Sequence, residues 1–505
     1  MNTIHADLTL TQIGINTSKT AIIYMREDCH ICRSEGFVAE ARVQITLNNR
    51  TIIATINTTN ITSNLLKPGE ASLSSYAWDL LVAKVGDKIS IAHPKPLDSL
   101  SSIRSKLYGH ELKTKEINHI VADVVSGQLS DVQIAMFLAG GAGSRFNTNE
   151  ILDLTKAMVQ TGKQLHWPSP FIVDKHCVGG LPGNRTTLIV VPIVAAFGLM
   201  MPKTSSRAIT SPAGTADTME VFAPVNLDIK TLQKVVEQEH GCIAWGGAVA
   251  LSPADDLLIR IERSIDLDSE GQMVASILSK KIAAGSTHIV IDIPIGPTAK
   301  VRTMEQATAL KNTLERIAKE FSIQLNSVFT DGTQPVGRGI GPALEARDVF
   351  SVLSCHPSAP QDLRDRALTL AGHLLEFSSK VTPGSGKQLA ESLLNSRKAL
   401  TKFEAICQAQ GGFFDIPSAP YTQTIVSNQA GTVTNIDNRL IARLAKLAGA
   451  PKSKVAGVEL LTPLNTMVEK GQPLLIVHAE TQGELDYALT FHRQGHPVID
   501  IEEST

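Results

Sequence analysis

The sequence predicts a multidomain α/β protein: a small helical domain and a large α/β sheet domain, flanked along the chain by an N-terminal β-barrel-like domain and a C-terminal α+β domain. Three observations lead to this prediction. The chain has 505 residues, enough for about three domains. Apolar strands alternate with helical patterns from residue 171 to about 415, which is typical of an α/β sheet. The segments on either side follow different patterns, so we expect separate domains there.

Residues 1–95 contain a weak internal repeat. Residues 24–45 and 74–91 each read as a short helix followed by a strand with alternating polarity. Two such halves predict a small β-barrel. Cys29 and Cys32 form a CxxC pair here, but no second pair has the spacing to complete a zinc site. We interpret both cysteines as ordinary helix positions.

Helices dominate residues 97–170, after a proline-containing linker at 93–97. Apolar residues recur with helical spacing and form the stripe Ile117, Ile120, Val121, Val124 and Val125. Two pairs of residues have the spacing of a capping box, which predicts that a helix begins at each. These pairs are Ser130 with Gln133 and Asn147 with Glu150.

The C-terminal segment, 425–505, reads as a separate α+β domain. Residues 468–475 resemble part of the small domains that carry lipoyl or biotinyl groups. The attachment lysine of those carriers is absent, because residues 464–467 read Leu-Asn-Thr-Met. We therefore expect this domain to be a scaffold.

Composition and charge exclude several classes of function. The formal net charge of −2 argues against a nucleic acid or a membrane surface as the main partner. No apolar run reaches the length of about 18 residues that a membrane-spanning helix requires. The first residues lack a basic segment followed by an apolar one, so we expect no signal peptide and a cytoplasmic protein.

Two loops carry the residues that indicate chemistry. The first, residues 174–187, follows the apolar stretch 171–173, which reads as a strand, and holds three glycines, a lysine and a histidine before a helical pattern begins at Thr186. Free backbone N–H groups and a helix N-terminus favour a phosphate group. The second loop, 203–217, is rich in hydroxyls and cations. A single glycine-rich turn is more often only a tight connection, but the pair of loops favours one phosphate site.

The second loop and a third block resemble known sequences. Residues 205–220 and 331–341, followed by Glu345, are similar to the thymidine and pyrimidine-nucleoside phosphorylases, the class II nucleoside phosphorylases, over residues 100–505. The resemblance implies a pentosyltransferase that cleaves an N-glycosidic bond with inorganic phosphate as co-substrate, without a metal, redox or organic cofactor. It also implies that 253–283 returns to the helical domain of 97–170, leaving 171–252 with 284–415 as the sheet domain. The helical domain would form the contact of a homodimer.

The resemblance also assigns roles to individual residues. Phosphate would be bound by Lys175, Cys177, Thr187, Ser205 and Thr215. Cys177 stands where the family usually has serine, and a thiol is a poor donor. Gly180 would contact the nucleoside or phosphate through its backbone. Ser276 and Lys280, spaced i,i+4 on one helix face, would bind the base.

The sequence leaves the base open. Ile261 stands where the pyrimidine enzymes have an arginine that contacts the base. The long chain resembles type 2 thymidine phosphorylases and AMP phosphorylases, which implies that Asp268 gives a proton to a purine and that Lys300 contacts the nucleotide. A 5′-phosphate would then bind the second loop, through Ser206, Arg207, Ala208, Ile209, Thr210 and Ser211. For a pyrimidine substrate, His176 is the candidate acid.

Two alternatives stand beside this reading. An anthranilate-type phosphoribosyltransferase would share the architecture, but the acidic pair that binds its magnesium is not evident. A non-catalytic nucleotide-binding protein of the same fold would have no reason to keep Lys175, Arg207, Thr215, Ser276 and Lys280 together. A test for phosphate-dependent substrate loss distinguishes a binding protein from an enzyme.

Overall fold

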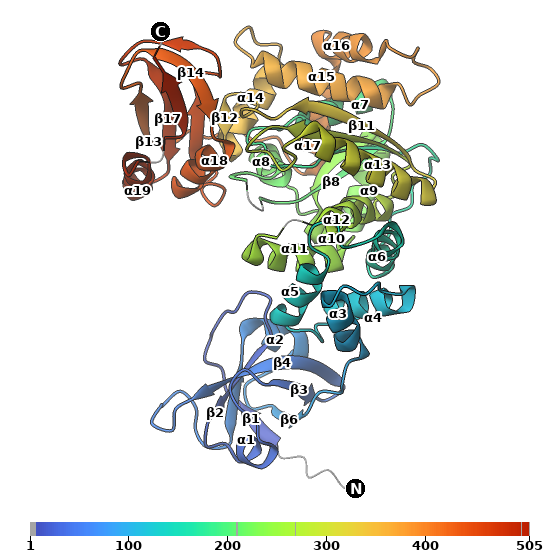
Figure 1. Cartoon of the computed structure of the whole chain (residues 1–505), viewed down its shortest axis with the longest axis vertical. Coiled ribbons are helices and arrows are strands. Elements are labelled where there is room, and N and C mark those ends of the chain that lie inside the picture. The colour runs from blue at the N-terminus through green and yellow to red at the C-terminus, as the bar shows by residue number, and fades with distance from the viewer. Residues whose placement is uncertain (1–6, 209–210, 268, 496, 504–505) are drawn as a thin grey trace. The chain divides into compact units, whose positions relative to one another are not determined.

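The computed structural model describes residues 7–208, 211–267, 269–495 and 497–503. The chain divides into two compact units, Met1–Gly140 and Gly141–Thr505. Across the described ranges, no helix has both the length and the apolar character needed to cross a membrane. Figure 1 shows the elements of both units, coloured from blue at the N-terminus to red at the C-terminus.

The first unit opens with a closed six-stranded barrel in the order β1-β5-β2-β4-β3-β6. Its elements are β1 Asp7–Leu10, β2 Ile22–Arg26, α1 His30–Glu35, β3 Arg42–Leu47, β4 Arg50–Thr59, β5 Glu70–Leu73, α2 Ser75–Leu81 and β6 Lys88–Ala92. The structure confirms a helix before a strand in each half. Cys29 caps α1 and Cys32 lies within that helix, both buried in the barrel core. The pair thus follows a strand-to-helix turn, a position that we had not expected.

Three helices complete the first unit: α3 Asp98–Leu107, α4 Thr114–Val125 and α5 Asp131–Gly140. The apolar residues Ile117, Ile120, Val121 and Val124 of α4 are buried, as the stripe predicts. The capping box before α5 is present, because Ser130 N donates to Gln133 Oε1 at 2.8 Å and Gln133 N to Ser130 Oγ at 3.3 Å.

The second unit begins with a group of helices from distant parts of the chain. Helix α6 (Thr148–Gln160) contacts α11 (Pro253–Ile265) and α12 (Glu270–Ala283), which come from far along the chain. The capping box at the start of α6 is confirmed by reciprocal bonds of 2.9 Å between Asn147 and Glu150. The grouping agrees with the expected return of 253–283, but the domain boundaries themselves stay a prediction.

A parallel sheet forms the centre of the second unit. Strands β7 (Val173–Cys177), β10 (His288–Ile295) and β11 (Gln324–Asp331) lie in the order β11-β10-β7. A parallel pair, β8 (Met201–Ser205) and β9 (Gly241–Trp245), continues from β7 through a bridge between Ile172 and Met200. The expected strand at 171–173 was placed too early, because β7 extends through Cys177. Lys175 and His176 therefore lie within the strand.

Helices cover this sheet and bury its apolar side chains. They are α7 Thr187–Phe197, α8 Thr215–Phe222, α9 Ile229–Glu239, α10 Gly246–Val249, α13 Met304–Glu320, α14 Pro342–Leu353, α15 Gln361–Leu375, α16 Gly386–Asn395 and α17 Lys398–Gln410. Helix α7 is buried on nearly every side and packs against α15 and α17. The N-termini of α7 and α8 follow the two loops that the sequence analysis identified.

The C-terminal module, shown in red in Figure 1, has its own core. Its elements are β13 Tyr421–Val426, β14 Gly431–Ile436, α18 Asn438–Leu447, β15 Gly457–Leu460, β16 Met467–Val468, β17 Pro473–Ala479, α19 Gln482–Arg493 and β18 Ile499–Glu502. One of its sheets, β12-β15-β17-β13, includes β12 (Gly339–Ile340), which belongs to the third sequence block. The module therefore pairs directly with a loop of the α/β part.

Candidate active site

Lys175 lies at the centre of the site, in β7, and is only 1% exposed. Its Nζ donates a hydrogen bond of 2.7 Å to Thr186 Oγ1 and lies 4.0 Å from Asp292 Oδ2. Burial lowers the pKa of Lys175, whereas Asp292 raises it. The lysine is thus held by the turn that follows its own strand, where the sequence places the phosphate.

Asn184 connects this lysine to the neighbouring strand. Its Nδ2 donates to Asp292 Oδ2 at 3.0 Å and to Cys177 Sγ at 3.2 Å, while its Oδ1 accepts from Thr186 Oγ1 at 3.2 Å. Burial raises the pKa of the Cys177 thiol to about 12. The thiol is therefore protonated at neutral pH, and in this structure it accepts from Asn184. Sequence reasoning missed Asn184 and Asp292.

A second cluster of charges is buried beneath Lys175. The carboxylate of Asp174 is 3.2 Å from Lys203 Nζ and 2.7 Å from Lys281 Nζ. Lys203 Nζ also donates to the backbone carbonyl of Lys175 at 2.6 Å. Burial lowers the pKa of Lys281 to about 7. With two lysines facing one aspartate, this part of the site favours an anion.

His176 is held neutral by these surroundings. Its pKa lies well below the usual value, first because the surrounding protein shields the half-buried ring from water and then because Lys281, Lys203 and Lys280 are close. An imidazole in this environment carries no charge at neutral pH, and it can donate one hydrogen bond and accept another. It could act as an acid only after an anion has raised its pKa.

The second loop was expected to begin at Lys203, but Lys203, Thr204 and Ser205 belong to β8, so the irregular part of the loop follows Ser205. Ser205 Oγ is buried and makes no hydrogen bond to the residues that the structure describes. Buried hydroxyls normally have a partner, so this one is free to bind a ligand. Thr215 begins α8, half-buried, and Thr187 begins α7, 4% exposed. Ser206 is exposed to solvent.

A single carboxylate closes the second loop at its base. Asp217 Oδ2 accepts from Ala208 N at 2.6 Å and from Gly214 N at 2.8 Å. Ser211 Oγ donates to Ala213 O at 2.7 Å. The predicted residues Ile209 and Thr210 lie outside the described residues.

Arg207 faces acidic side chains of α8. Its guanidinium donates to Asp217 at 3.1 Å and to Glu220 at 2.8 Å, and it lies 5.1 Å from the ring centre of Trp245. Glu220 is the main cause of the raised pKa of Arg207. In this structure, Arg207 stabilises the loop through these contacts.

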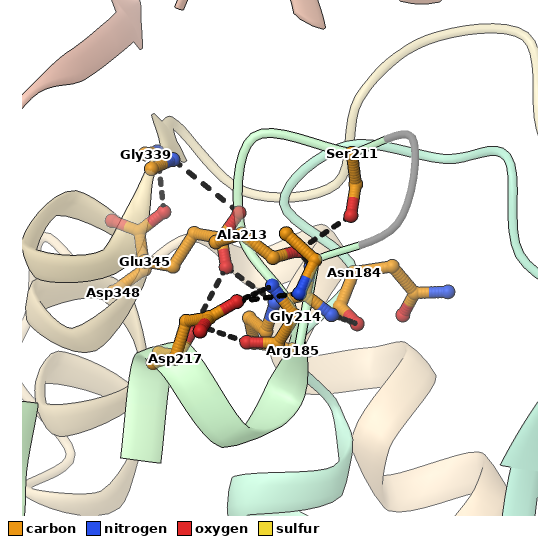
Figure 2. A network of polar contacts seen from close by, with 12 residues as sticks. Asn184, Arg185, Ser211, Ala213, Gly214, Asp217, Gly339, Glu345 and Asp348 are labelled. Carbon is orange, nitrogen blue, oxygen red and sulfur yellow. Dashed lines mark hydrogen bonds and ion pairs between the residues drawn. The ribbon is translucent and has the colours of Figure 1, made fainter. Parts of the chain in front are cut away.

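Arg185 and Glu345 connect the three sequence blocks (Figure 2). Arg185 Nε donates to Glu345 Oε2, and Arg185 Nη2 donates to Ala213 O in the second loop. Glu345 also accepts from Thr218 Oγ1 at 2.8 Å and from Gly341 N at 3.4 Å. The resemblance included Glu345 without a role, and sequence reasoning missed Arg185.

Gly180 brings the first loop against Lys300. Its φ of +83° is in the left-handed region, and a Cβ there would lie 2.6 Å from Lys300 N. Both the conformation and the close approach require glycine. The backbones of Gly180 and Lys300 are therefore adjacent, and the Lys300 residue is exposed.

The expected base-binding residues share one face of α12. Lys280 Nζ donates to Ser276 Oγ at 3.2 Å and to Asp255 Oδ2 at 2.7 Å. Because Lys280 lowers the pKa of His176, this face lies within electrostatic reach of β7. Ile261, in α11, is buried at 5% exposure. Asp268, the expected proton donor, lies outside the described residues.

Among the described residues, no group of three or more His, Cys, Asp or Glu side chains is arranged to hold a metal ion. The donors that the site offers are ammonium groups, hydroxyls and backbone N–H groups. These are suited to an oxyanion.

Comparison with known proteins agrees with this arrangement. Residues 169–400 match the glycosyl transferase family a/b domain, and residues 100–162 match the helical bundle domain of the same family. The anthranilate phosphoribosyltransferase of Thermus thermophilus has a TM-score of 0.51 at 18% identity, covering 61% of this chain and 99% of its own. That similarity shows the fold alone.

Full-length relatives are much closer in sequence. A Legionella pneumophila (strain Corby) protein is 60% identical, covering 99% of this chain and 96% of its own. A Hahella chejuensis protein is 55% identical, covering 99% and 98%. Both are named "Putative thymidine phosphorylase". The fold and these matches define an enzyme of the pentosyltransferase class. More narrowly, the chain belongs to the pyrimidine-nucleoside phosphorylase family.

Proposed function

We propose that this protein catalyses the reversible phosphorolysis of the N-glycosidic bond of a nucleoside or nucleotide. The products would be a free base and a (deoxy)ribose 1-phosphate or ribose 1,5-bisphosphate. The main supporting observation is the buried Lys175, hydrogen-bonded to Thr186 at the start of α7 and next to a cluster of two lysines and one aspartate. Such a site attracts an anion and excludes water from it.

The arrangement suggests how the residues divide the reaction. Phosphate would bind Lys175 together with the hydroxyls of Thr187, Ser205 and Thr215, with Cys177 beside it. One phosphate oxygen attacks the anomeric carbon, the bond from that carbon to the base nitrogen breaks, and its electron pair leaves with the base. Holding phosphate in place supplies proximity. Hydrogen bonds from α12 to the base would stabilise the negative charge that develops there.

Two observations bear on the substrate. The names of the relatives favour thymidine. The buried, apolar Ile261 offers no cation to a pyrimidine carbonyl, and the hydroxyls of Ser206 and Ser211 lie in a loop that could accept a 5′-phosphate. These favour a nucleoside monophosphate such as AMP. Asp268 would then be the proton donor, and His176 would have that role for a pyrimidine.

One experiment separates the two substrates. Phosphate-dependent release of free base is measured side by side from AMP, CMP, UMP, thymidine and uridine. Release from the monophosphates assigns the second loop to the 5′-phosphate, and release from thymidine alone makes the enzyme a thymidine phosphorylase. If no substrate loses its base in the presence of phosphate, the proposed function is wrong. We further propose a homodimer that requires no organic or redox cofactor.

A further inference from the structure

The side chain of Arg185 attaches the far end of the second loop to the first loop. This residue immediately precedes Thr186, which holds Lys175, and it is 8% exposed. From there its guanidinium reaches Ala213 O in the second loop and Glu345, which follows the third block. A single planar group of the first loop therefore bonds both the second loop and α14 (Figure 2).

Glu345 holds the guanidinium in place. It is 1% exposed and lies in the first turn of α14. Burial raises its pKa, while Arg185 and Thr218 lower it. Its oxygens accept from Arg185, Thr218 and Gly341, so the position of the carboxylate is fixed from three elements. A buried carboxylate of this kind fixes its partner in return.

The two sides of the site differ in how they depend on Arg185. Lys175 is positioned by the side chains of Thr186, Asn184 and Asp292, whose hydrogen bonds to one another do not include the guanidinium. Arg185 Nη1 donates instead to the backbone carbonyl of Asn184, at 3.4 Å. The far end of the second loop, by contrast, is bonded to the guanidinium directly. Gly214 N binds Asp217, which belongs to the loop's own helix, whereas Ala213 O binds Arg185 from the first loop.

From this difference we infer that Arg185 and Glu345 form a positioning pair, which sets the distance between the phosphate subsite and the second loop. The inference rests on the proposed function, because it assumes that the second loop binds the nucleoside or nucleotide. It adds two residues to the proposed function, which would control the affinity for the substrate without contacting the substrate.

The test is the conservative variant Arg185→Lys. A lysine keeps the charge but cannot bond Glu345 and Ala213 O with one planar group. We expect the KM for the nucleoside or nucleotide to rise about tenfold or more, since small displacements of positioned groups have effects of this size. The KM for inorganic phosphate should change far less. Arg364→Lys is the matched control, because Arg364 makes a 2.9 Å pair with Glu391 between α15 and α16. It should leave both KM values unchanged.

Thr218→Val provides a second variant that keeps the pair intact. It removes the hydroxyl that donates to Glu345 at 2.8 Å and to Gly214 O at 3.2 Å, so the same KM should rise, but less. If the Arg185→Lys variant does not fold, the Thr218→Val variant tests the positioning role by itself. Equal rises in both KM values, a fall in kcat alone, or no change would overturn the positioning role. Absence of phosphate-dependent base release from the unaltered enzyme would instead contradict the proposed function.

Discussion

At the scale of single residues, the site is defined by buried charges. Lys175, Lys203 and Lys281 are each less than 5% exposed, and each has an aspartate within 4.0 Å. Removing such charges from water costs several kcal/mol per ion unless they are paired. Here Asp174 is paired with both Lys203 and Lys281, so the cluster keeps excess positive charge wherever Lys281, with its pKa lowered to about 7, is protonated. An anion bound near Lys175 would offset that charge.

Lys175→Ala should raise the KM for phosphate by about 100-fold or abolish turnover, because it removes a preorganised cation at the anion site. Steady-state kinetics with varied phosphate measure this. Lys311→Ala is a suitable control, since Lys311 is 37% exposed and pairs only loosely with Glu315, at 3.8 Å. Normal phosphate kinetics in the Lys175 variant would contradict the assignment.

The lowered pKa of His176 predicts a pH effect. In the folded protein His176 stays neutral well below pH 6.5, whereas in the unfolded chain it gains a proton near its ordinary value of about 6.5. The unfolded state therefore binds more protons in this range, and stability falls as the pH drops below about 6.5. His176→Gln should reduce that loss, as measured by urea unfolding at several pH values. An unchanged pH dependence would mean that His176 is not held neutral.

Phosphate should have the opposite effect on the same residue. A bound anion favours the charged imidazole, so the pKa of His176 should rise when phosphate is added. NMR titration of ¹³C-labelled histidines measures this, with the His176→Gln variant identifying the signal. A pKa that does not move with phosphate would place the anion away from β7.

The residue types in the loops predicted this site, but not all of its members. Glycines, hydroxyls and Lys175 are visible as a local pattern in the sequence. Asp292 and Glu345 are not, because each meets its partner only through folding, across more than a hundred residues. No local sequence signal marks Asn184 or Arg185 either, because their roles depend on partners that come close only in the folded protein.

At the scale of elements, the turn between β7 and α7 determines the geometry. Gly179 and Gly180 have φ values of +100° and +83°, which L-residues rarely adopt. The sequence predicted a tight glycine-rich turn here but placed its start too early. Lys-His-Cys has no strong strand propensity, and pairing of 173–177 with β10 extends the strand through these residues.

Gly179→Ala and Gly180→Ala form a matched pair. Each substitution places an alanine in the left-handed backbone conformation that the glycine already has, which lowers the stability of the fold by about 1–2 kcal/mol. A Cβ at Gly179 meets no atom within 4 Å, whereas one at Gly180 meets Lys300 N at 2.6 Å. Both variants should lose thermal stability, but Gly180→Ala should also lose much more of its kcat/KM. Equal losses of activity would show that the contact with Lys300 is unimportant.

At the scale of the whole molecule, the C-terminal module supports the site. Gly339 and Ile340 of β12 pair with Glu459 and Val458 of β15. The sequence predicted a separate α+β domain, and the module has a core of its own. Its scaffold role stays a prediction. The sequence did not predict the shared sheet, because a two-residue strand such as β12 leaves no periodic pattern.

Gly457→Val tests this support. A Cβ at Gly457 would lie 2.1 Å from Ile340 O and would disrupt the junction between β15 and β12. We expect a lower melting temperature together with a reduced kcat/KM. Gly471→Ala, in an open turn of the same module with φ +87°, is the control and should lower only the melting temperature. Full activity in the Gly457 variant would mean that the site does not need the shared sheet.

The pairing of β12 with β15 also constrains the order of events during synthesis. The two phosphate-binding loops and β12 leave the ribosome long before β15 is made. The β12 strand, which lies just before Glu345 in the chain, can complete its pairing only after the chain has emerged as far as Leu460. A nascent chain that stalls before that point would contain the three sequence blocks, but its β12 strand would lack its partner β15. This enzyme should therefore become active only when its synthesis is almost complete.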